Sequence, residues 1–205
     1  MYSSRSGLIF GFHGCDETIA QDVVNRRINL RESHNNYDWL GHGVYFWENS
    51  PERALEYAFF LKENPERAKN PIINPSVIGA IIDLGYCFDL IDYNMLGLLK
   101  SGYEIFNSVW ENTGRKLPMN KTAGHSSDLL MRELDCAVIE SIHDFRKRKS
   151  LVPFDSVKGV FWEGDQLYQN AGFREKNHIQ ICIINPNCIK GFFLPRELNP
   201  RFNKV

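Results

Sequence analysis

The sequence predicts a single α+β domain in which a strand-rich frame carries two long helices. Short apolar runs bounded by Gly, Asn or Pro occur in both halves of the chain, which is typical of strands. Residues 91–150 instead repeat apolar side chains at helical spacing. A length of 205 residues, 43% of them hydrophobic, suffices for one sizeable core. We therefore expect one domain over residues 1–205, with 91–150 as a helical segment within it.

The N-terminal part predicts two strand–helix units. Residues 8–12 form an apolar run, typical of a buried strand, that ends at a His-Gly pair. Thr18 and Gln21 have the spacing of a capping box, which predicts a helix start at Thr18. In the second unit, Ser50 precedes Pro51, a pattern that predicts Ser50 as N-cap and Pro51 at the first helical position.

The rest of the chain predicts two further helices and most of the sheet. The helices are expected at residues 93–112 and 126–147, because apolar side chains recur there every three or four residues. Further strands are expected at residues 43–47, 77–84, 178–184 and 189–194, with an extended segment at 158–163 and polar loops at 29–40 and 164–176.

Composition excludes several classes of protein. A net charge of −1 and a pI near 6.6 give no overall attraction to nucleic acid or to an anionic membrane. The five cysteines are scattered and form no C-x-x-C pair, which favours reduced thiols over disulfides or a zinc site. No apolar run approaches the ~20 residues of a membrane span. We expect a cytoplasmic protein without a metal and without a membrane partner.

Three separated fragments carry the chemical signal: Phe12-His13-Gly14, residues 41–46 (GHGVYF) and residues 180–185 (QICIIN). In this order they resemble the ADP-ribosyltransferase superfamily of the diphtheria-toxin and PARP type. The motifs of that family run Y-H-G-[TS], G-K-G-[IV]-Y-F and E-[YF]-[IV]-V-Y-[ND]. The resemblance covers residues 8–60, 77–90 and 170–195, whereas 91–150 has no counterpart in it.

The resemblance implies a split β-sheet with an NAD+ cleft and a set of site residues. His13 is expected to bond the adenosine ribose, and the Gly14 backbone the nicotinamide carboxamide. Tyr45 and Tyr57 are expected to enclose the nicotinamide, because a cationic pyridinium stacks well on electron-rich rings. The implied catalytic residues are His13, Tyr45 and Gln180, and the implied NAD+-binding residues are His13, Gly14, Arg31, Tyr45 and Tyr57.

The chain departs from the family pattern at two positions. Gln180 stands where PARPs have the catalytic Glu, and a neutral amide offers no charge to a cationic transition state. Glu175, in the preceding loop, is an alternative source of that charge. Ala54 stands where PARPs have a Ser that bonds nicotinamide. Two interpretations therefore stay open: a mono-ADP-ribosyltransferase, and a catalytically weak module that binds NAD+ or ADP-ribose.

The acceptor is expected to be a macromolecule. In the family, the loop before the third motif faces the acceptor, and here that loop contains Phe161, Trp162, Tyr168, Phe173 and Glu175. Its aromatic residues fit an unpaired base or a protein side chain equally well, or they simply anchor the loop to the core. The basic cluster at residues 146–149 is either a solvated helix end or a phosphate patch beside the cleft.

The resemblance also suggests a biological setting. Short stand-alone bacterial members of the superfamily often act as intracellular toxins that a partner antitoxin holds in check. Polymer formation is not expected, because Gln180 is poorly suited to activating a ribose hydroxyl. Transfer of an RNA 2′-phosphate, a reaction of another branch, is disfavoured by the near-neutral charge of the chain.

Overall fold

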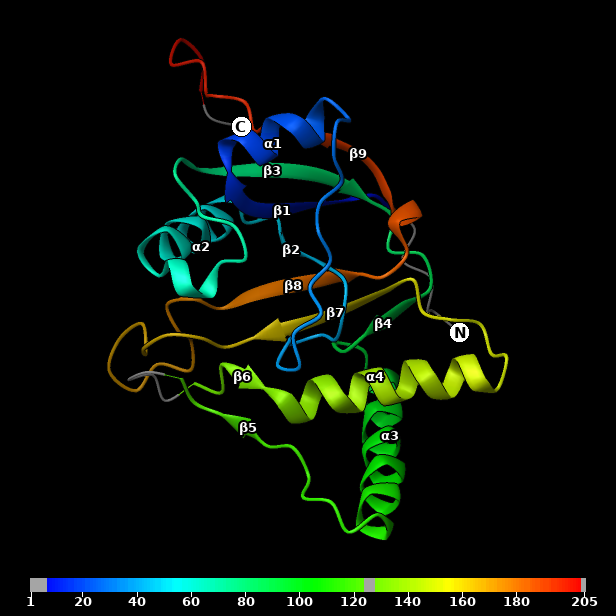
Figure 1. The fold of residues 1–205 in the computed structure, drawn as a ribbon. Coiled ribbons are helices and arrows are strands. Elements are labelled where there is room, and N and C mark those ends of the chain that lie inside the picture. The colour runs from blue at the N-terminus through cyan, green and yellow to red at the C-terminus, as the bar shows by residue number, and fades with distance from the viewer. Residues whose placement is uncertain (1–6, 124–127, 204–205) are drawn as a thin grey trace.

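In the computed structural model, which describes residues 7–123 and 128–203, one large sheet is flanked by helices on several sides (Figure 1). The main sheet has seven strands in the order β4-β7-β8-β2-β1-β3-β9, and all neighbours are antiparallel except β4 and β7. The α+β class expected from the sequence is confirmed. The strands are β1 (Ile9–Asp16), β2 (Val44–Glu48), β3 (Pro75–Ile82), β4 (Cys87–Asp89), β7 (Ser156–Phe161), β8 (His178–Ile183) and β9 (Ile189–Phe193).

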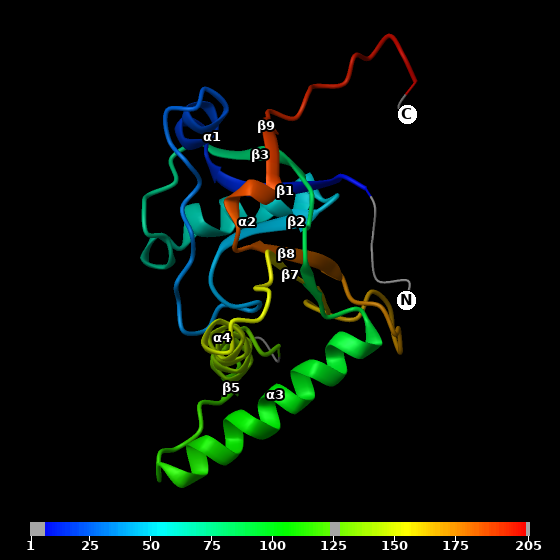
Figure 2. The same cartoon turned by 90° about the vertical axis from the view of Figure 1, so that its right-hand side faces the viewer.

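The helices divide into an upper and a lower group. In Figure 1, α1 (Glu17–Val24) and α2 (Pro51–Glu63) flank the part of the sheet that contains β1 and β3. Below it, α4 (Glu133–Arg148) covers β7 and β8, and α3 (Tyr93–Asn112) runs diagonally away beneath α4 (Figure 2). Short elements complete the described chain: η1 (Pro65–Arg67), β5 (Asn120–Lys121), β6 (Met131–Arg132) and η2 (Pro186–Cys188).

The two sides of the sheet bury separate cores. One core lies under α1 and includes Phe46, Ile78 and Ile181, none of which is exposed to solvent. The other joins β7 and β8 to α3 and α4 through Phe88, Ile139 and other buried side chains. Because strand residues alternate between faces, neighbouring residues of β8 contribute to opposite cores. The helical segment at 91–150 is therefore packed on the same sheet that carries the motif residues.

The sheet opens between β1 and β2. β1 pairs with β3 along its whole length, but with β2 only at Gly11 and Phe12. From His13 onward the β1–β2 ladder is missing, although β2 continues to pair with β8. β1 also runs through His13 and Gly14 to Asp16, so these motif residues lie inside the strand and not at its end. The described chain thus has a split at the position of the first two sequence motifs.

The start of α1 differs from the prediction. Asp16, not Thr18, is the N-cap residue, and its Oδ1 accepts hydrogen bonds from the Thr18 amide and hydroxyl at 3.0 and 2.7 Å. Its Oδ2 accepts from the amides of Ile73 and Asn74, both at 2.8 Å. The capping-box interpretation of Thr18 is wrong because the Asp16 carboxylate, two residues earlier, accepts from the Thr18 amide and so caps the helix.

Asp16 predicts an acid-dependent loss of stability. Burial alone raises the pKa of its carboxyl, but hydrogen bonds from Asn74, Thr18 and Ile73 outweigh burial and lower it from 3.8 to about 2. The charged carboxylate therefore stabilises the fold above pH 4, and this contribution is lost as the pH falls toward 2. Asp16→Asn is expected to lower the free energy of unfolding at pH 7 by about 1–2 kcal/mol.

Chemical denaturation at pH 7 and pH 3 checks this expectation. The difference between wild type and Asp16→Asn should shrink at the lower pH. Asp22→Asn is the matched control, because Asp22 lies on the same helix but forms an exposed ion pair with Arg27. A pH-independent difference, or an equal effect of the control, contradicts the assignment.

Two of the other predicted helix starts differ in part from the structure. At α2, Pro51 occupies the first helical position as expected, whereas the Ser50 side chain makes no capping hydrogen bond. α4 begins at Glu133 and not at 126, and residues 124–127 lie outside the described chain. Residues 131–132 pair with β5 instead, and the Asn120 side chain accepts from the Leu134 and Asp135 amides at 3.0 and 3.2 Å. The early part of the predicted helix is thus replaced by a hairpin-like contact that caps the true start.

Candidate functional site

His13 bridges the split in the sheet. Its Nδ1 lies 2.8 Å from the backbone oxygen of Tyr45, and since a carbonyl only accepts, Nδ1 carries the hydrogen. Burial lowers the pKa of His13, and the hydrogen bond to Tyr45 raises it by less. The ring is therefore neutral at pH 7, and its Nε2 holds a lone pair that no group of the described residues contacts by a hydrogen bond. A neutral imidazole in this tautomer accepts a hydrogen bond from a hydroxyl.

Tyr45 is held rigidly by the loop that precedes it. Its hydroxyl donates to the Gly41 carbonyl at 2.7 Å and accepts from the Leu40 amide at 2.8 Å. Burial raises the pKa of this hydroxyl well above its ordinary value, so it stays protonated. The Tyr45 backbone oxygen meets His13 at the same time. Two of the predicted catalytic residues are thus in direct contact.

Tyr57 lies on α2 and presents a partly exposed ring. Its ring centroid is 5.2 Å from that of Trp47 and 6.1 Å from that of Phe60, and 39% of the residue is exposed. Burial chiefly raises the pKa of both Tyr45 and Tyr57, and the buried Asp38 carboxylate raises each further. Both tyrosine hydroxyls therefore lie within electrostatic reach of one carboxylate, although no aromatic contact joins the two rings within the described residues.

Gly14 is the point where α2 touches β1. A Cβ atom at this position would lie 2.0 Å from the Ala54 backbone oxygen and 3.3 Å from the Ala58 side chain. Both alanines are fully buried. Ala54, at the position where the family pattern has Ser, therefore lies on the helix face that packs on this strand. Only glycine leaves α2 this close to the first motif.

Gly14→Ala is expected to lower the free energy of unfolding by about 3 kcal/mol, because the added methyl group meets backbone and cannot be relieved by a rotamer change. Denaturant unfolding monitored by circular dichroism measures the change. Gly191→Ala in β9 is the control, because a Cβ there meets nothing within 4 Å. Equal stability of the two variants contradicts the close approach of α2.

Gln180 lies on β8, which neighbours β2 directly. Its register partners are Trp47 on β2 and Gly159 on β7. Directly opposed residues share one face of a sheet, so Gln180 lies on the same face as Trp47 and, by alternation, Tyr45. Its carboxamide is partly exposed and makes no hydrogen bond with the described residues. The strands that carry Gln180, Tyr45 and His13 are thus consecutive in the sheet.

Arg31 is the one predicted NAD+-binding residue that the structure leaves apart. Its side chain is exposed, and it forms no ion pair or hydrogen bond with the described residues. It lies in the segment between α1 and β2. Its predicted role in binding pyrophosphate or adenosine therefore stays a prediction without a contact to support it.

The predicted acceptor loop contains one core residue and three exposed rings. Phe161 is buried, with its ring 4.7 Å from that of Trp39, so it anchors the loop and is closed to an acceptor in this conformation. For Phe161, the alternative that the aromatic residues anchor the loop to the core is therefore correct. The Glu175 side chain is exposed and faces solvent. The three rings that are more than 60% exposed are Trp162, Tyr168 and Phe173.

Charged side chains that sequence reasoning missed pin this loop at both ends. Arg53 of α2 donates to Glu163 at 2.8 Å, and Lys176 forms an ion pair with Glu56 at 2.7 Å. Arg174 donates to Asp128 at 2.8 Å. No local pattern signals these pairs, because the partners are far apart in the sequence. The loop is consequently tied to α2, the helix that carries Tyr57.

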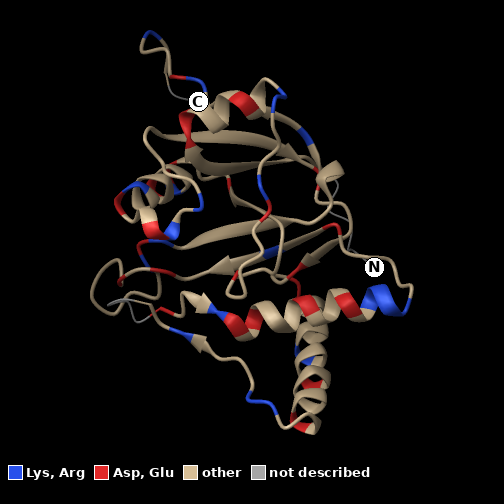
Figure 3. Ribbon diagram, in the orientation of Figure 1, with Lys and Arg blue, Asp and Glu red and all other residues tan. Residues whose placement is uncertain are grey.

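The basic cluster at the end of α4 lies away from this loop. Figure 3 shows it at the far end of the helix from β6, whereas Asp128 and Arg132, near β6, contact the loop and Phe161. Arg146 donates from Nε and Nη2 to the Val152 carbonyl and stacks on Phe154 at 4.3 Å. The interpretation as a phosphate patch beside the cleft is therefore not supported. The exposure of residues 147–149 fits the alternative, a solvated helix end, of which Arg146 alone is anchored.

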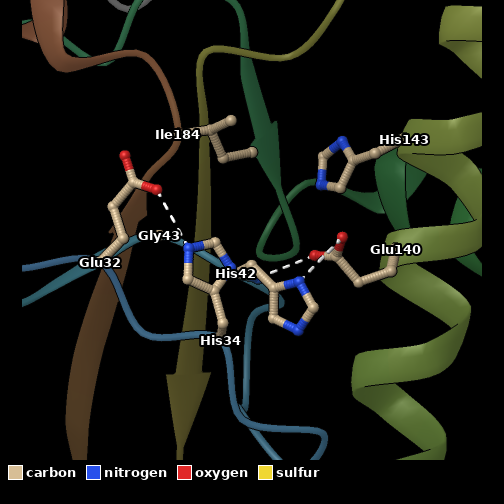
Figure 4. Close-up of a pocket in the computed structure, with 7 residues that line it drawn as sticks. All are labelled: Glu32, His34, His42, Gly43, Glu140, His143 and Ile184. Carbon is tan, nitrogen blue, oxygen red and sulfur yellow. Dashed lines mark hydrogen bonds and ion pairs between the residues drawn. The ribbon is translucent and has the colours of Figure 1, made fainter.

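A pocket of about 210 Å³ lies beside the loop that precedes β2 (Figure 4). His42 and Glu140 face each other in it, with 3.3 Å between Nδ1 and Oε2, and His34 lies close to His42 with ring centroids 5.2 Å apart. Despite this concentration of donors, no group of three His, Cys, Asp or Glu side chains in the described residues is placed to hold a metal ion. The residues that line the pocket are Glu32, His34, His42, Gly43, Glu140, His143 and Ile184.

Comparisons with known proteins give little further direction. No family model matches the chain, and no solved structure matches it. The chain is similar to an uncharacterized protein of Methanocaldococcus jannaschii, 27% identical over 198 residues that cover 87% of this chain and 83% of that protein. The unmatched share of this chain is smaller than residues 91–150, so at least part of the helical segment is common to both. Within the described residues, no helix is long and apolar enough to cross a membrane.

Proposed function

We propose that the protein is an NAD+-dependent mono-ADP-ribosyltransferase that acts on a macromolecular acceptor in the cytoplasm. The observation that carries this proposal is the split between β1 and β2, which the His13–Tyr45 hydrogen bond bridges and the strand of Gln180 flanks. Three motifs that are far apart in the sequence occupy three consecutive strands. This arrangement supports the resemblance on which the proposal rests.

The donor site would use groups that are free or exposed at this split. His13 Nε2 would accept a hydrogen bond from a ribose hydroxyl of the adenosine half, and the Gly14 backbone would bond the carboxamide. The exposed face of Tyr57 would stack on the pyridinium ring. Gln180 would orient a hydroxyl of the nicotinamide ribose. The neutral state of His13 suits this role, since an imidazolium would have no lone pair on Nε2.

The proposed reaction exchanges one glycosidic bond for another. The bond between ribose C1′ and the nicotinamide nitrogen breaks, and nicotinamide leaves with the electron pair as a neutral molecule. The ribose passes through an oxocarbenium-like state, which an acceptor nucleophile attacks at C1′ with loss of its proton. The protein's part is to hold the donor in place and to stabilise developing positive charge. The exposed rings of the 162–173 segment would meet the acceptor.

The experiment mixes purified protein with NAD+ labelled in the adenylate phosphate and with a bacterial lysate. Parallel samples receive protease or nuclease before the macromolecules are separated. Label that survives protease and is lost to nuclease identifies a nucleic-acid acceptor, and the reverse identifies a protein acceptor. Failure to release nicotinamide or to label any macromolecule contradicts transferase activity. A co-purifying inhibitor, of the kind that restrains a toxin, would be removed beforehand by denaturation and refolding.

The second candidate is a module that binds NAD+ or ADP-ribose without cleaving it. Gln180 favours this candidate, because its neutral amide replaces the charge that the family uses in catalysis. Calorimetric titration with NAD+ and a nicotinamide-release assay on the same sample separate the two. Saturable binding without release supports the module, and binding with release supports the enzyme.

A further inference from the structure

One face of the helical segment contacts most of the loop formed by residues 33–43, which we name the bridging loop. Reciprocal backbone hydrogen bonds between Ser33 and Gly43, at 2.8 and 3.1 Å, close this loop. At its centre, the Trp39 indole N–H donates to the Leu130 carbonyl at 2.8 Å, and the Arg132 guanidinium stacks 4.5 Å above the Trp39 ring. The segment that lacks a counterpart in the family pattern thus holds the loop between the first two motifs.

Glu140, in the middle of α4, makes the most direct of these contacts. Its Oε1 accepts from the His42 backbone amide at 2.8 Å, and its Oε2 lies 3.3 Å from His42 Nδ1 (Figure 4). Gly41 has a φ of +78°, and a Cβ atom there would lie 2.5 Å from the Glu140 carboxylate. The backbone at 41–42 is therefore pressed against this side chain in a conformation that favours glycine.

The peptide unit between Gly41 and His42 contacts both Glu140 and Tyr45. Gly41, the neighbour of His42, provides the carbonyl that accepts from the Tyr45 hydroxyl at 2.7 Å. The Tyr45 backbone in turn accepts from His13 across the split at 2.8 Å. A continuous path of short contacts therefore runs from Glu140 through residues 41–42 and Tyr45 to His13. The path consists of three hydrogen bonds, the Gly41–His42 peptide unit and the covalent side chain of Tyr45.

We propose that Glu140 is a positioning residue for the donor site, which it fixes by holding residues 41–42 under the Tyr45 hydroxyl. The expected effect of Glu140 on NAD+ rests on the proposed function, whereas its hold on residues 41–42 does not. Glu140 touches none of the groups assigned to NAD+ and lies 98 residues from His42 in sequence. Its contribution is to keep the Tyr45 ring and the His13 imidazole in the orientation that the donor needs.

Glu140→Ala is expected to raise the KM for NAD+ about tenfold, while kcat changes less than threefold, because the substitution misplaces donor contacts without removing a reacting group. Hydrogen exchange of the peptide spanning residues 33–45 is expected to accelerate at least about tenfold in the same variant. Glu140→Gln retains an acceptor for the His42 amide and is expected to lie between wild type and alanine in both measurements.

Asp144→Ala is the matched control, because Asp144 is one turn further along α4 and exposed. Asp144→Ala is expected to match wild type both in the KM for NAD+ and in the hydrogen exchange of residues 33–45. Unchanged exchange in Glu140→Ala overturns the positioning role, and so does an unchanged KM with altered melting temperature alone. If wild type neither binds nor cleaves NAD+, the proposed function has failed, while the exchange comparison still decides whether Glu140 holds the loop. Should Glu140→Ala not fold, Glu140→Gln supplies the same comparison with a smaller expected effect.

Discussion

Replacing His13 with alanine is expected to lower kcat/KM for NAD+ cleavage by about 10²–10³-fold, the usual cost of removing a well-placed polar contact from an active site. The substitution removes two interactions together. The hydrogen bond to the Tyr45 backbone, which closes the split between β1 and β2, is lost. The Nε2 lone pair, to which we assign a ribose hydroxyl, is lost as well.

His13→Asn separates these two contributions. An Asn amide can place its N–H near the position of Nδ1 and so retain the bond to the Tyr45 carbonyl, but it has no group at the position of Nε2. We expect this variant to unfold like wild type and to lose nearly as much activity as the alanine variant. Nicotinamide release tests the expected loss of activity, and thermal unfolding of the same samples tests the expected stability. Retained activity in His13→Asn would show that Nε2 contacts no substrate.

Replacing Gln180 with glutamate is expected to raise kcat by about 10²-fold, because a carboxylate stabilises the developing oxocarbenium charge and an amide does not. Gln and Glu are nearly isosteric. Gln180 is partly exposed and its amide has no hydrogen-bond partner in the described residues, so the new charge would not be stranded in the core. Single-turnover measurement of nicotinamide release from saturating NAD+ isolates this effect from binding.

Gln180→Ala provides the opposing variant. We expect it to reduce kcat about tenfold, since the loss of an orienting hydrogen bond costs on the order of 1 kcal/mol. A glutamate variant slower than wild type would mean that the amide itself is required, and full activity in the alanine variant would place Gln180 outside the site. Either result would contradict the catalytic role assigned to Gln180.

Local patterns in the sequence predicted most of the regular elements correctly. The strand at 43–47 and the helix at 93–112 agree with β2 and α3, because apolar periodicity and Pro or Gly boundaries act over a few residues. The start of α4 was predicted too early, because the side chain of Asn120 and the β5–β6 pairing set it from outside the helix. The N-cap of α1 was misplaced for a related reason, since Asp16 also binds the chain at Ile73 and Asn74.

The site was only partly accessible to sequence reasoning. The motifs selected His13 and Tyr45, and the structure places them in contact. Phe161 was grouped with the acceptor residues, but its burial depends on Trp39 and Arg132, which reach it from distant parts of the chain. Glu140 had no signal at all, since an acidic residue on an amphipathic helix is ordinarily solvated. Long-range polar contacts of this kind follow from the packing of elements, which residue spacing does not encode.

The most direct test of the central claim is the amount of nicotinamide that purified wild-type protein releases from NAD+, compared with His13→Ala under the same conditions. The account predicts release by wild type that increases with time and protein concentration and falls by at least about 10²-fold in the variant. Release that is equal in the two folded proteins contradicts a donor site at the split between β1 and β2. Absence of both release and NAD+ binding in the folded wild type contradicts the proposed function altogether.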